Sequence, residues 1–344
     1  MRVLVTGGCG YIGSRLVPSL LAANHDVTVL DALIFGPSTL PDHPRLRLIE
    51  GDIRDTSHLR EAMRGQERVI HLAFLSNDPD FRLDPAIARD VNLKGFENTL
   101  EAALSAGIDR WIQASSCSVY GTGNSSESFV DETHPPMPLT DYARHKASCD
   151  HLLLGTRRRG FAPVSLRAAT VCGYAPRQRM DLTFNRFVIE GYLKRRIVVE
   201  RSQRYRPHLS LSDLVALYLR VLEAPEETVS GAIFNAAYGN HTLAQSAQTL
   251  AAHMGPDVVV QTSATDTADE RSYRISSRLV ERRLGFHPRE RLTDAADGLI
   301  DAVKRGLLVA PETNPAYDNR IMQQRHDWST YCSSPRKECH EHSS

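Results

Sequence analysis

Tyr142 and Lys146 are the residues of this chain whose types and spacing most directly suggest chemistry. They lie four residues apart in Tyr142-Ala-Arg-His-Lys146, a spacing that puts both side chains on one face of a helix. A lysine ammonium beside a phenol stabilises the phenolate, and the tyrosine can then remove a proton from a substrate hydroxyl. A serine-rich segment, Gln113-Ala-Ser-Ser-Cys-Ser-Val-Tyr-Gly121, precedes the pair. Such pairs also occur by chance on solvated helices, so the prediction depends on the segments around them.

Three glycines follow the first expected strand, in Thr6-Gly-Gly-Cys-Gly-Tyr-Ile-Gly13. In this spacing Gly7 permits a tight turn, Gly10 lets the backbone approach a pyrophosphate, and Gly13 allows a helix to pack closely on a strand. The helix expected over residues 11–23 would direct its N-terminus at the negative charge. An ordinary glycine turn is the alternative, but the strand before and the helix after favour a dinucleotide site. A cationic nicotinamide ring bound there would further favour the phenolate.

Acidic residues follow the second and third expected strands. Asp31 ends the second, where a carboxylate accepts hydrogen bonds from an adenosine ribose and repels a 2′-phosphate. The sequence therefore favours NAD over NADP as the cofactor. Asp52 and Ile53 follow the third strand and could hold the adenine edge. Each of these positions could instead form an ordinary turn.

Short β-branched runs alternate with amphipathic stretches in the first half of the chain, which predicts an α/β fold. We expect a Rossmann-type doubly wound parallel sheet, with ligands at the carboxyl ends of the strands, and a smaller C-terminal substrate-binding lobe. The expected strands are residues 2–5, 27–30, 46–49, 69–72, 111–114 and 164–167, and helices are expected near 212–222 and 242–253. The NAD-binding domain would span residues 1–170, with segments returning to it from about 207–240. Residues 171–325 would form mainly the substrate-binding lobe, and residues 326–344 a polar, mobile tail.

Composition excludes several classes of protein. Lys plus Arg and Asp plus Glu are both 41, so no sequence-wide attraction to nucleic acid or to an anionic membrane is expected. No apolar run approaches the roughly 20 residues of a membrane helix and no signal-peptide pattern is present, so we expect a cytoplasmic protein. The six cysteines lack framework spacing and should be reduced thiols. No metal site is predicted, because the tail residues Cys332, Cys339, His340 and His342 match no standard zinc pattern.

These segments together resemble the extended short-chain dehydrogenases/reductases, in their nucleotide-sugar epimerase/dehydratase group, over about residues 1–310. The resemblance is carried by Thr6-Gly-Gly-Cys-Gly-Tyr-Ile-Gly13, Val29-Leu-Asp31, Gly51-Asp-Ile53, His71-Leu-Ala73, Val91-Asn92, Ser115-Ser-Cys-Ser-Val-Tyr-Gly121, Tyr142-Ala-Arg-His-Lys146 and Arg206-Pro-His-Leu-Ser-Leu-Ser-Asp213.

The resemblance implies a role for each matched position. Ser116 would share the substrate hydroxyl with the catalytic Tyr142, and Lys146 would also bond the nicotinamide ribose. The expected cofactor-binding residues are Gly7, Gly10, Tyr11, Ile12, Gly13, Asp31, Asp52, Ile53, Leu72, Ala73, Asn92, Tyr142 and Lys146. The expected substrate-binding residues are Ser76, Ser118, Asn185, Arg206 and Arg271, where an arginine suits a diphosphate because its planar fork donates two hydrogen bonds. A surface charge is the alternative reading of each arginine. A homodimer through residues 85–105 and 142–159 is also implied.

The group divides by the residues after the catalytic serine. Dehydratases of this group resemble each other in carrying Asp-Glu there, because eliminating water needs a further acid and base, whereas here Cys117 and Ser118 occupy those positions. The UDP-galactose type of epimerase usually has Tyr-Phe-Asn where this chain has Ala168-Ala-Thr170, and often a lysine near Ser76, so the sugar and the nucleotide base stay open. We therefore expect an NAD-dependent nucleotide-sugar epimerase acting at C4 through a 4-keto intermediate. The alternatives are a nucleotide-sugar 4-dehydrogenase that releases the keto product and, more remotely, a non-catalytic NAD-binding protein.

Overall fold

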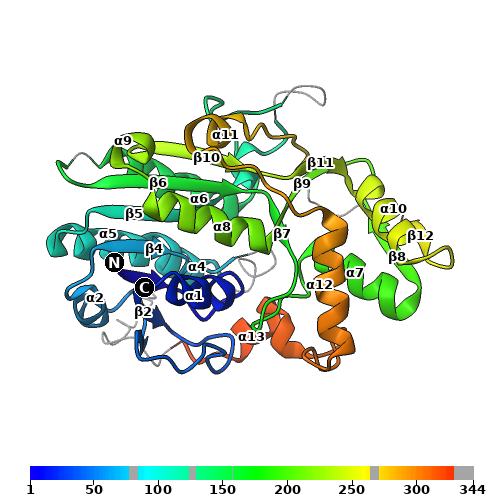
Figure 1. Ribbon diagram of the computed structural model, residues 1–344, viewed down its shortest axis with the longest axis horizontal. Helices are drawn as coiled ribbons and strands as arrows, with labels where there is room; N and C mark the ends of the chain where they lie inside the picture. The colour runs from blue at the N-terminus through cyan, green and yellow to red at the C-terminus, as the bar shows by residue number, and fades with distance from the viewer. Residues whose placement is uncertain (77–83, 124–128, 157, 264–270, 329–344) are drawn as a thin grey trace, which may run out of the picture.

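The structure is a computed structural model that describes residues 1–76, 84–123, 129–156, 158–263 and 271–328 (Figure 1). Its centre is a seven-stranded sheet in the order β10-β6-β5-β4-β1-β2-β3, in which every pairing is parallel. The predicted Rossmann-type doubly wound sheet is therefore confirmed. The strands are β1 (Arg2–Thr6), β2 (Asp26–Asp31), β3 (Leu46–Glu50), β4 (Arg68–His71), β5 (Arg110–Ser116), β6 (Ala162–Ala168) and β10 (Ala232–Ala236).

The central strands are apolar on both sides because helices cover both faces of the sheet. Along β1, Val3 and Val5 pack into one hydrophobic core and Leu4 into the other, as the alternation of side chains along a strand requires. Helices α1 (Gly13–Ala22) and α8 (Leu211–Glu223) contact each other in the first core. The second core is covered by α2 (Thr56–Met63), α4 (Pro85–Arg89), the π-helical turn η1 (Asp90–Lys94), α5 (Gly95–Ala106) and α6 (Asp141–Gly155).

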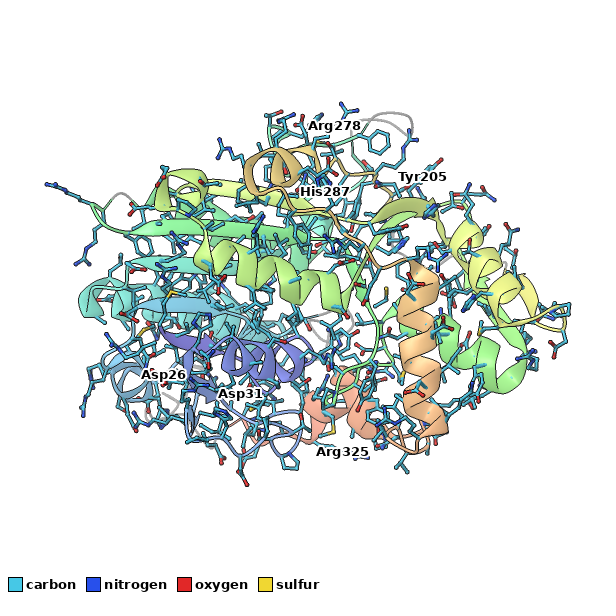
Figure 2. All side chains as sticks on the ribbon, viewed as in Figure 1. Asp26, Asp31, Tyr205, Arg278, His287 and Arg325 are labelled. Atoms are coloured by element: carbon cyan, nitrogen blue, oxygen red, sulfur yellow. The ribbon has the colours of Figure 1, made fainter. Side chains whose placement is uncertain are left out.

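The strand order changes direction at β1, which has β2 on one side and β4 on the other. Thr6 at the end of β1 lies level with Leu30 of β2 and with His71 of β4. The loops that follow these strands therefore leave the sheet at one edge, and a crevice forms between them. Asp26 and Asp31, labelled in Figure 2, mark the two ends of β2, and Asp31 is at the crevice.

A second lobe, made of α7, β8, α10, β12 and α12, stands beside that edge of the sheet (Figure 1). It has its own hydrophobic core, in which Phe184 and Phe187 are fully buried. A three-stranded sheet in the order β11-β9-β7 lies between the lobe and the main sheet. The bounds are β7 (Thr170–Cys172), α7 (Thr183–Lys194), β8 (Arg196–Glu200), β9 (Tyr205–Ser210), β11 (Gly239–Thr242), α10 (Leu243–Met254), β12 (Val259–Ser263) and α12 (Leu292–Lys304).

The C-terminal segment returns from the second lobe toward the main sheet (Figure 1). Its α13 (Asn319–Arg325) is followed by Trp328, whose side chain packs against the second core of the main sheet. The sequence placed the start of a mobile tail at residue 326, but the packed chain extends two residues further, to Trp328, because an indole provides apolar surface to bury. Cys332, Cys339, His340 and His342 lie outside the described residues. The remaining short elements are η2 (Cys117–Tyr120), α9 (Glu226–Val229), α11 (Arg278–Leu284) and η3 (Pro315–Tyr317).

Within the described ranges, none of the helices combines the length and the apolar composition that crossing a membrane requires.

Candidate active site

A cavity of about 340 Å³ opens at the carboxyl edge of the main sheet and extends to the second lobe. It brings together most of the residues that the sequence singled out. The predicted residues that line it are Gly7, Gly10, Tyr11, Ile12, Gly13, Asp31, Asp52, Ile53, Leu72, Ala73, Ser76, Ser116, Ser118, Tyr142, Lys146, Arg206 and Arg271. Asn92 and Asn185 are not part of the lining.

The glycine loop has the shape that a dinucleotide cradle needs. Gly7 has φ of +71°, and a Cβ there would come within 2.6 Å of the backbone nitrogen of Ala73. A Cβ on Gly13 would lie 2.2 Å from the carbonyl oxygen of Gly8, so the start of α1 can approach the loop only without a side chain. Gly10 differs, because its nearest contact would be the carbonyl oxygen of Gly7 at 3.3 Å. Its open face belongs to the cavity, beside the N-terminus of α1, and suits a pyrophosphate.

Asp31 is fixed at the end of β2 by backbone donors. The N–H of Cys9 donates to Oδ2 of Asp31 at 2.8 Å, and the N–H of Leu33 donates to Oδ1 at 2.8 Å. Burial raises the pKa of Asp31 above its usual value, while these two donors and the guanidinium of Arg177 act in the opposite direction. The carboxylate is thus held in one orientation at the crevice, where an adenosine ribose would meet it.

Asp52 is held by Arg54 at the neighbouring position of the cavity. The Nη2 and Nε atoms of Arg54 donate to Oδ2 of Asp52 at 2.8 and 3.0 Å, and the Arg54 N–H donates to Oδ1 at 2.8 Å. Both side chains are largely buried. Ile53 lies between them and contributes apolar surface to the lining, as an adenine edge requires.

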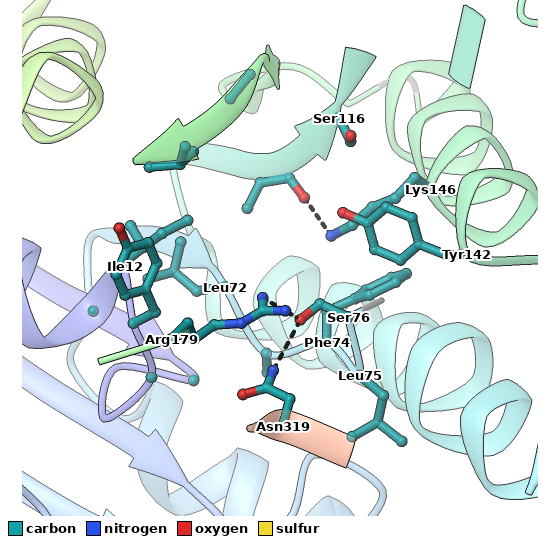
Figure 3. Close-up of a pocket in the computed structure, with 18 of the residues that line it drawn as sticks. Ile12, Leu72, Phe74, Leu75, Ser76, Ser116, Tyr142, Lys146, Arg179 and Asn319 are labelled. Carbon is teal, nitrogen blue, oxygen red and sulfur yellow. Dashed lines mark hydrogen bonds between the residues drawn. The ribbon is translucent and has the colours of Figure 1, made fainter. Parts of the chain in front are cut away.

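Helix α6 presents the tyrosine and the lysine. The Thr140 hydroxyl caps its N-terminus by accepting from the N–H of Ala143 at 3.3 Å. Lys146 donates from Nζ to the carbonyl oxygen of Ala114 at 2.5 Å, and this ammonium lies 3.5 Å from the centre of the Phe74 ring. The rings of Phe74 and Tyr142 meet edge to face at 5.7 Å (Figure 3). Burial lowers the pKa of Lys146 to about 8, against the attraction of Cys149 and Asp150.

The end of β5 supplies the serines. Ser116 is its last residue, and its Oγ accepts from the N–H of Ser118 at 3.1 Å, which fixes the turn into η2. Ser118 is buried, and its hydroxyl has no hydrogen-bond partner within the described part of the chain. Cys117 points the other way: its side chain is 0% exposed and its Sγ donates to the carbonyl oxygen of Arg167 at 2.9 Å. Burial raises the pKa of the Cys117 thiol, so it stays protonated.

A buried ion pair ties α6 to the strands beside it. Arg167 of β6 donates from Nε to Oδ2 of Asp150 at 2.9 Å, and the two side chains are each 3% exposed. Asp150 also accepts from the hydroxyls of Ser115 and Ser165 at 2.9 and 2.6 Å. The sequence analysis missed this carboxylate, although its position four residues after Lys146 places it on the same face of α6.

Arginines from the three-stranded sheet and the loops beside it also line the cavity. Arg206 and Arg271 lie together, with Nη1 of Arg206 donating to the carbonyl oxygen of Arg271. Arg177 and Arg179 also line the cavity and were not predicted; Arg177 lies 4.2 Å from the centre of the Phe35 ring. The sequence signal that could have identified them is the pair of arginines in Arg177-Gln178-Arg179, in the loop after β7. Arg179 is paired with the carboxylate of Asp181, whereas the other guanidinium groups of the lining add positive charge that suits an anionic ligand.

The two predicted asparagines outside the lining support residues within it. Asn92 accepts from the N–H of Leu75 at 2.8 Å and donates to its carbonyl oxygen at 3.0 Å, which fixes the loop after β4. Asn185 accepts from the N–H of Gly173 at 2.9 Å and donates to the hydroxyl of Tyr11 at 3.2 Å. The side-chain amides of both asparagines therefore form hydrogen bonds with other residues of the protein.

A family model agrees with this geometry. The model described as the NAD dependent epimerase/dehydratase family matches residues 3–237, which include the glycine loop, the serines and the Tyr142–Lys146 pair.

Individual relatives include both epimerases and dehydratases. A UDP-glucose 4-epimerase of Lacticaseibacillus casei is 36% identical over 51% of this chain and 53% of its own length, so that match spans about half of the relative. A dTDP-glucose 4,6-dehydratase of Streptomyces griseus is 31% identical over 88% of this chain and 93% of its own. The solved structure of a Thermus thermophilus UDP-glucose 4-epimerase complex with NAD is 27% identical, with a TM-score of 0.75 over 88% of this chain and 100% of that one.

Proposed function

The chain belongs to the NAD dependent epimerase/dehydratase family, and from that premise we propose that it is a nucleotide-sugar epimerase that inverts C4 of the sugar. It is an enzyme of the extended short-chain dehydrogenase/reductase type, and NAD is its cofactor. The glycine cradle, the oriented Asp31 carboxylate and the apolar Ile53 edge fit that cofactor.

One observation supports epimerisation over dehydration. Eliminating water from a 4-keto sugar needs an acid and a base beside the reacting carbons. The position after Ser116 holds Cys117, whose thiol is buried, faces Arg167 and stays protonated. The next residue is a serine, whose hydroxyl is neutral at ordinary pH. The absence of an acid and base pair at these positions therefore favours oxidation and reduction at C4 over the elimination of water.

The catalytic residues have separate tasks in this cycle. Tyr142 takes the proton from the C4 hydroxyl and later returns it to the keto oxygen, while Ser116 orients that oxygen. Lys146 provides the positive charge that favours the phenolate. Bound NAD supplies the acceptor and donor of the hydride at C4. Between the two hydride transfers the keto sugar must rotate within the cavity, so that its other face is reduced.

The substrate would be held by groups on both walls. We assign the diphosphate to Arg206 and Arg271, because both residues line the cavity and a guanidinium group offers several donors to phosphate oxygens. Ser118 has a buried hydroxyl without a partner in the described residues, and we assign it to a sugar hydroxyl. Ser76 lines the cavity on the loop after β4 and would lie near the same sugar.

This proposal can be tested by adding a panel of nucleotide sugars while the oxidation state of the bound cofactor is measured. Native mass spectrometry of fresh protein would show whether NAD co-purifies, and UDP-, GDP-, CDP- and dTDP-sugars would then be added one at a time. We expect retained NAD and a sugar that epimerises without net NADH. Stoichiometric NADH that persists would assign a dehydrogenase instead, and release of water from the sugar would assign a dehydratase.

A further inference from the structure

The C-terminal arm, residues 311–328, begins on the second lobe. Glu312 pairs with Lys194 of α7, with 2.7 Å between Oε1 and Nζ. The N–H of Met180 donates to the carbonyl oxygen of Tyr317 at 2.9 Å, which attaches the arm to the loop that carries Arg179. This end of the arm is therefore attached to the second lobe and to the loop after β7.

The middle of the arm enters the active-site cavity through Asn319. This side chain is 2% exposed and lines the cavity. Its Nδ2 donates to the hydroxyl of Ser76 at 3.3 Å, and Nη1 of Arg179 donates to the same oxygen at 2.9 Å (Figure 3). Three segments thus meet at the Ser76 hydroxyl: the loop after β4, the loop after β7 and the C-terminal arm.

The same loop after β4 carries Phe74, two residues before Ser76. Phe74 contacts both catalytic side chains, Tyr142 through its ring edge and Lys146 through its face. The residue that Asn319 contacts and the aromatic ring that packs on Tyr142 and Lys146 are therefore on one short loop.

The far end of the arm lies against the opposite end of the dinucleotide site. The guanidinium of Arg54 lies 5.8 Å from the centre of the Trp328 ring, and the indole N–H donates to the carbonyl oxygen of Gln323 at 3.2 Å. Arg54 is the residue that holds Asp52 beside the expected adenine position. The arm consequently contacts supports of the site at both its nicotinamide end, through Ser76, and its adenine end, through Arg54.

We propose that the C-terminal arm is a clamp for the cofactor, and that Asn319 is the positioning residue that locks it to the loop of Phe74 and Ser76. NAD leaves only when the arm separates from Ser76 and Arg54. An epimerase needs its cofactor to stay through both transfers, and a strap attached to both lobes provides that retention without contacting the reacting atoms. The inference depends on NAD as the cofactor and not on which sugar reacts.

The rate of NAD release from the loaded protein, measured without any sugar, tests the clamp. Released NAD would be trapped by excess alcohol dehydrogenase and ethanol and followed as NADH. Asn319→Ala should speed release about fivefold, the size expected for one lost hydrogen bond, and Trp328→Ala should speed it by at least as much. Gln324→Ala changes an exposed residue of the same helix and should release NAD at the rate of the unchanged protein.

Coupling to Ser76 separates positioning from a general loss of stability. If Asn319 acts through Ser76, the double variant Asn319→Ala with Ser76→Ala should release NAD no faster than the faster of the two single variants. Hydrogen exchange of the unchanged protein gives a second readout, and NAD should slow exchange over residues 319–325. Release rates that multiply in the double variant, or exchange in α13 that NAD leaves unaltered, would overturn the proposal. Because no sugar is present, either result leaves the assignment of C4 epimerisation untouched.

Discussion

At the scale of single residues, the environment of Lys146 shows how the fold stabilises a buried cation. Its ammonium has a carbonyl oxygen on one side and the face of Phe74 on the other, and both stabilise positive charge. Burial nevertheless lowers its pKa to about 8, so the proton is held loosely. The residue is therefore poised to respond to charge that develops on Tyr142.

The pKa of Lys146 predicts how stability depends on pH. An unfolded lysine keeps its proton up to about pH 10.4, whereas the folded one releases it near pH 8. Between these values the unfolded chain binds more protons, so the free energy of unfolding should rise with pH, by at most about 1.4 kcal/mol per pH unit. Urea unfolding of NAD-stripped protein between pH 8 and 10 would measure this slope. The difference from Lys146→Met isolates it, and parallel curves for the two proteins would contradict the assignment.

Removing the Tyr142 hydroxyl should slow turnover strongly while leaving the cofactor site intact. Tyr142→Phe keeps the ring that packs on Phe74 but loses the proton acceptor, so we expect kcat to fall about 10²- to 10⁴-fold with NAD still bound. Steady-state assays on the sugar identified by the panel, with native mass spectrometry for NAD, would test this. Tyr238→Phe, at an exposed tyrosine outside the cavity lining, should behave as the unchanged protein. Full activity in Tyr142→Phe would remove this residue from the mechanism.

At the scale of elements, the turn from β1 into α1 separates two kinds of glycine. Gly13→Ala places a methyl group 2.2 Å from a backbone oxygen, so it should lower the free energy of unfolding by about 2–3 kcal/mol or more. Gly10→Ala meets nothing nearer than 3.3 Å and should change stability by less than about 1 kcal/mol. Its methyl group nevertheless occupies the face that a pyrophosphate must approach, so NAD binding should weaken strongly. Urea unfolding without NAD and a titration with NAD would distinguish the two; wild-type affinity in Gly10→Ala would be inconsistent with the cradle.

The elements that could be predicted from the sequence are those that a short stretch of residues specifies by its own pattern. Each of the six expected strands lies within or beside an observed strand, because β-branched runs bounded by turns are visible in a short window. Gly7 and the Tyr142–Lys146 pair could be singled out for the same reason, since each belongs to a short motif, and Asp31 could be singled out by its place at the end of an expected strand. Strand β10 was not specified, because pairing with β6 depends on contacts between segments far apart in the chain.

The sequence could not indicate which residues far apart in the chain contact each other in the candidate site. Asn319 lies 243 residues from Ser76, and nothing in its neighbourhood distinguishes it from a surface asparagine. Phe74 has an apolar residue on each side, and its position over Lys146 depends on how two elements pack. For Asp150, the sequence could indicate its place on the same face of α6 as Lys146, but it could not indicate its partner Arg167, which comes from strand β6.

At the scale of the whole molecule, we propose a homodimer through the face formed by residues 85–105 and by α6. Helix α6 packs beside η1 of that segment, and Leu152 of α6 is 40% exposed. Leu152→Arg should therefore shift the protein toward monomer in light scattering, because a charge would be buried in the interface. Leu193→Arg is the matched control, since Leu193 is 42% exposed on α7 of the second lobe. A monomeric unchanged protein, or equal effects of the two variants, would refute this interface.

The order of the strands also bears on how the chain is made. Strand β10 covers the edge of β6, but β7, α7, β8, β9, α8 and α9 are synthesised between them. In a nascent chain the edge of β6 therefore stays unpaired from the time β6 leaves the ribosome until residue 236 emerges. Such an edge can pair with another chain and start aggregation. The yield of folded protein should then depend on how quickly translation delivers residues 169–236, so slow codons in that stretch would cost more than slow codons elsewhere.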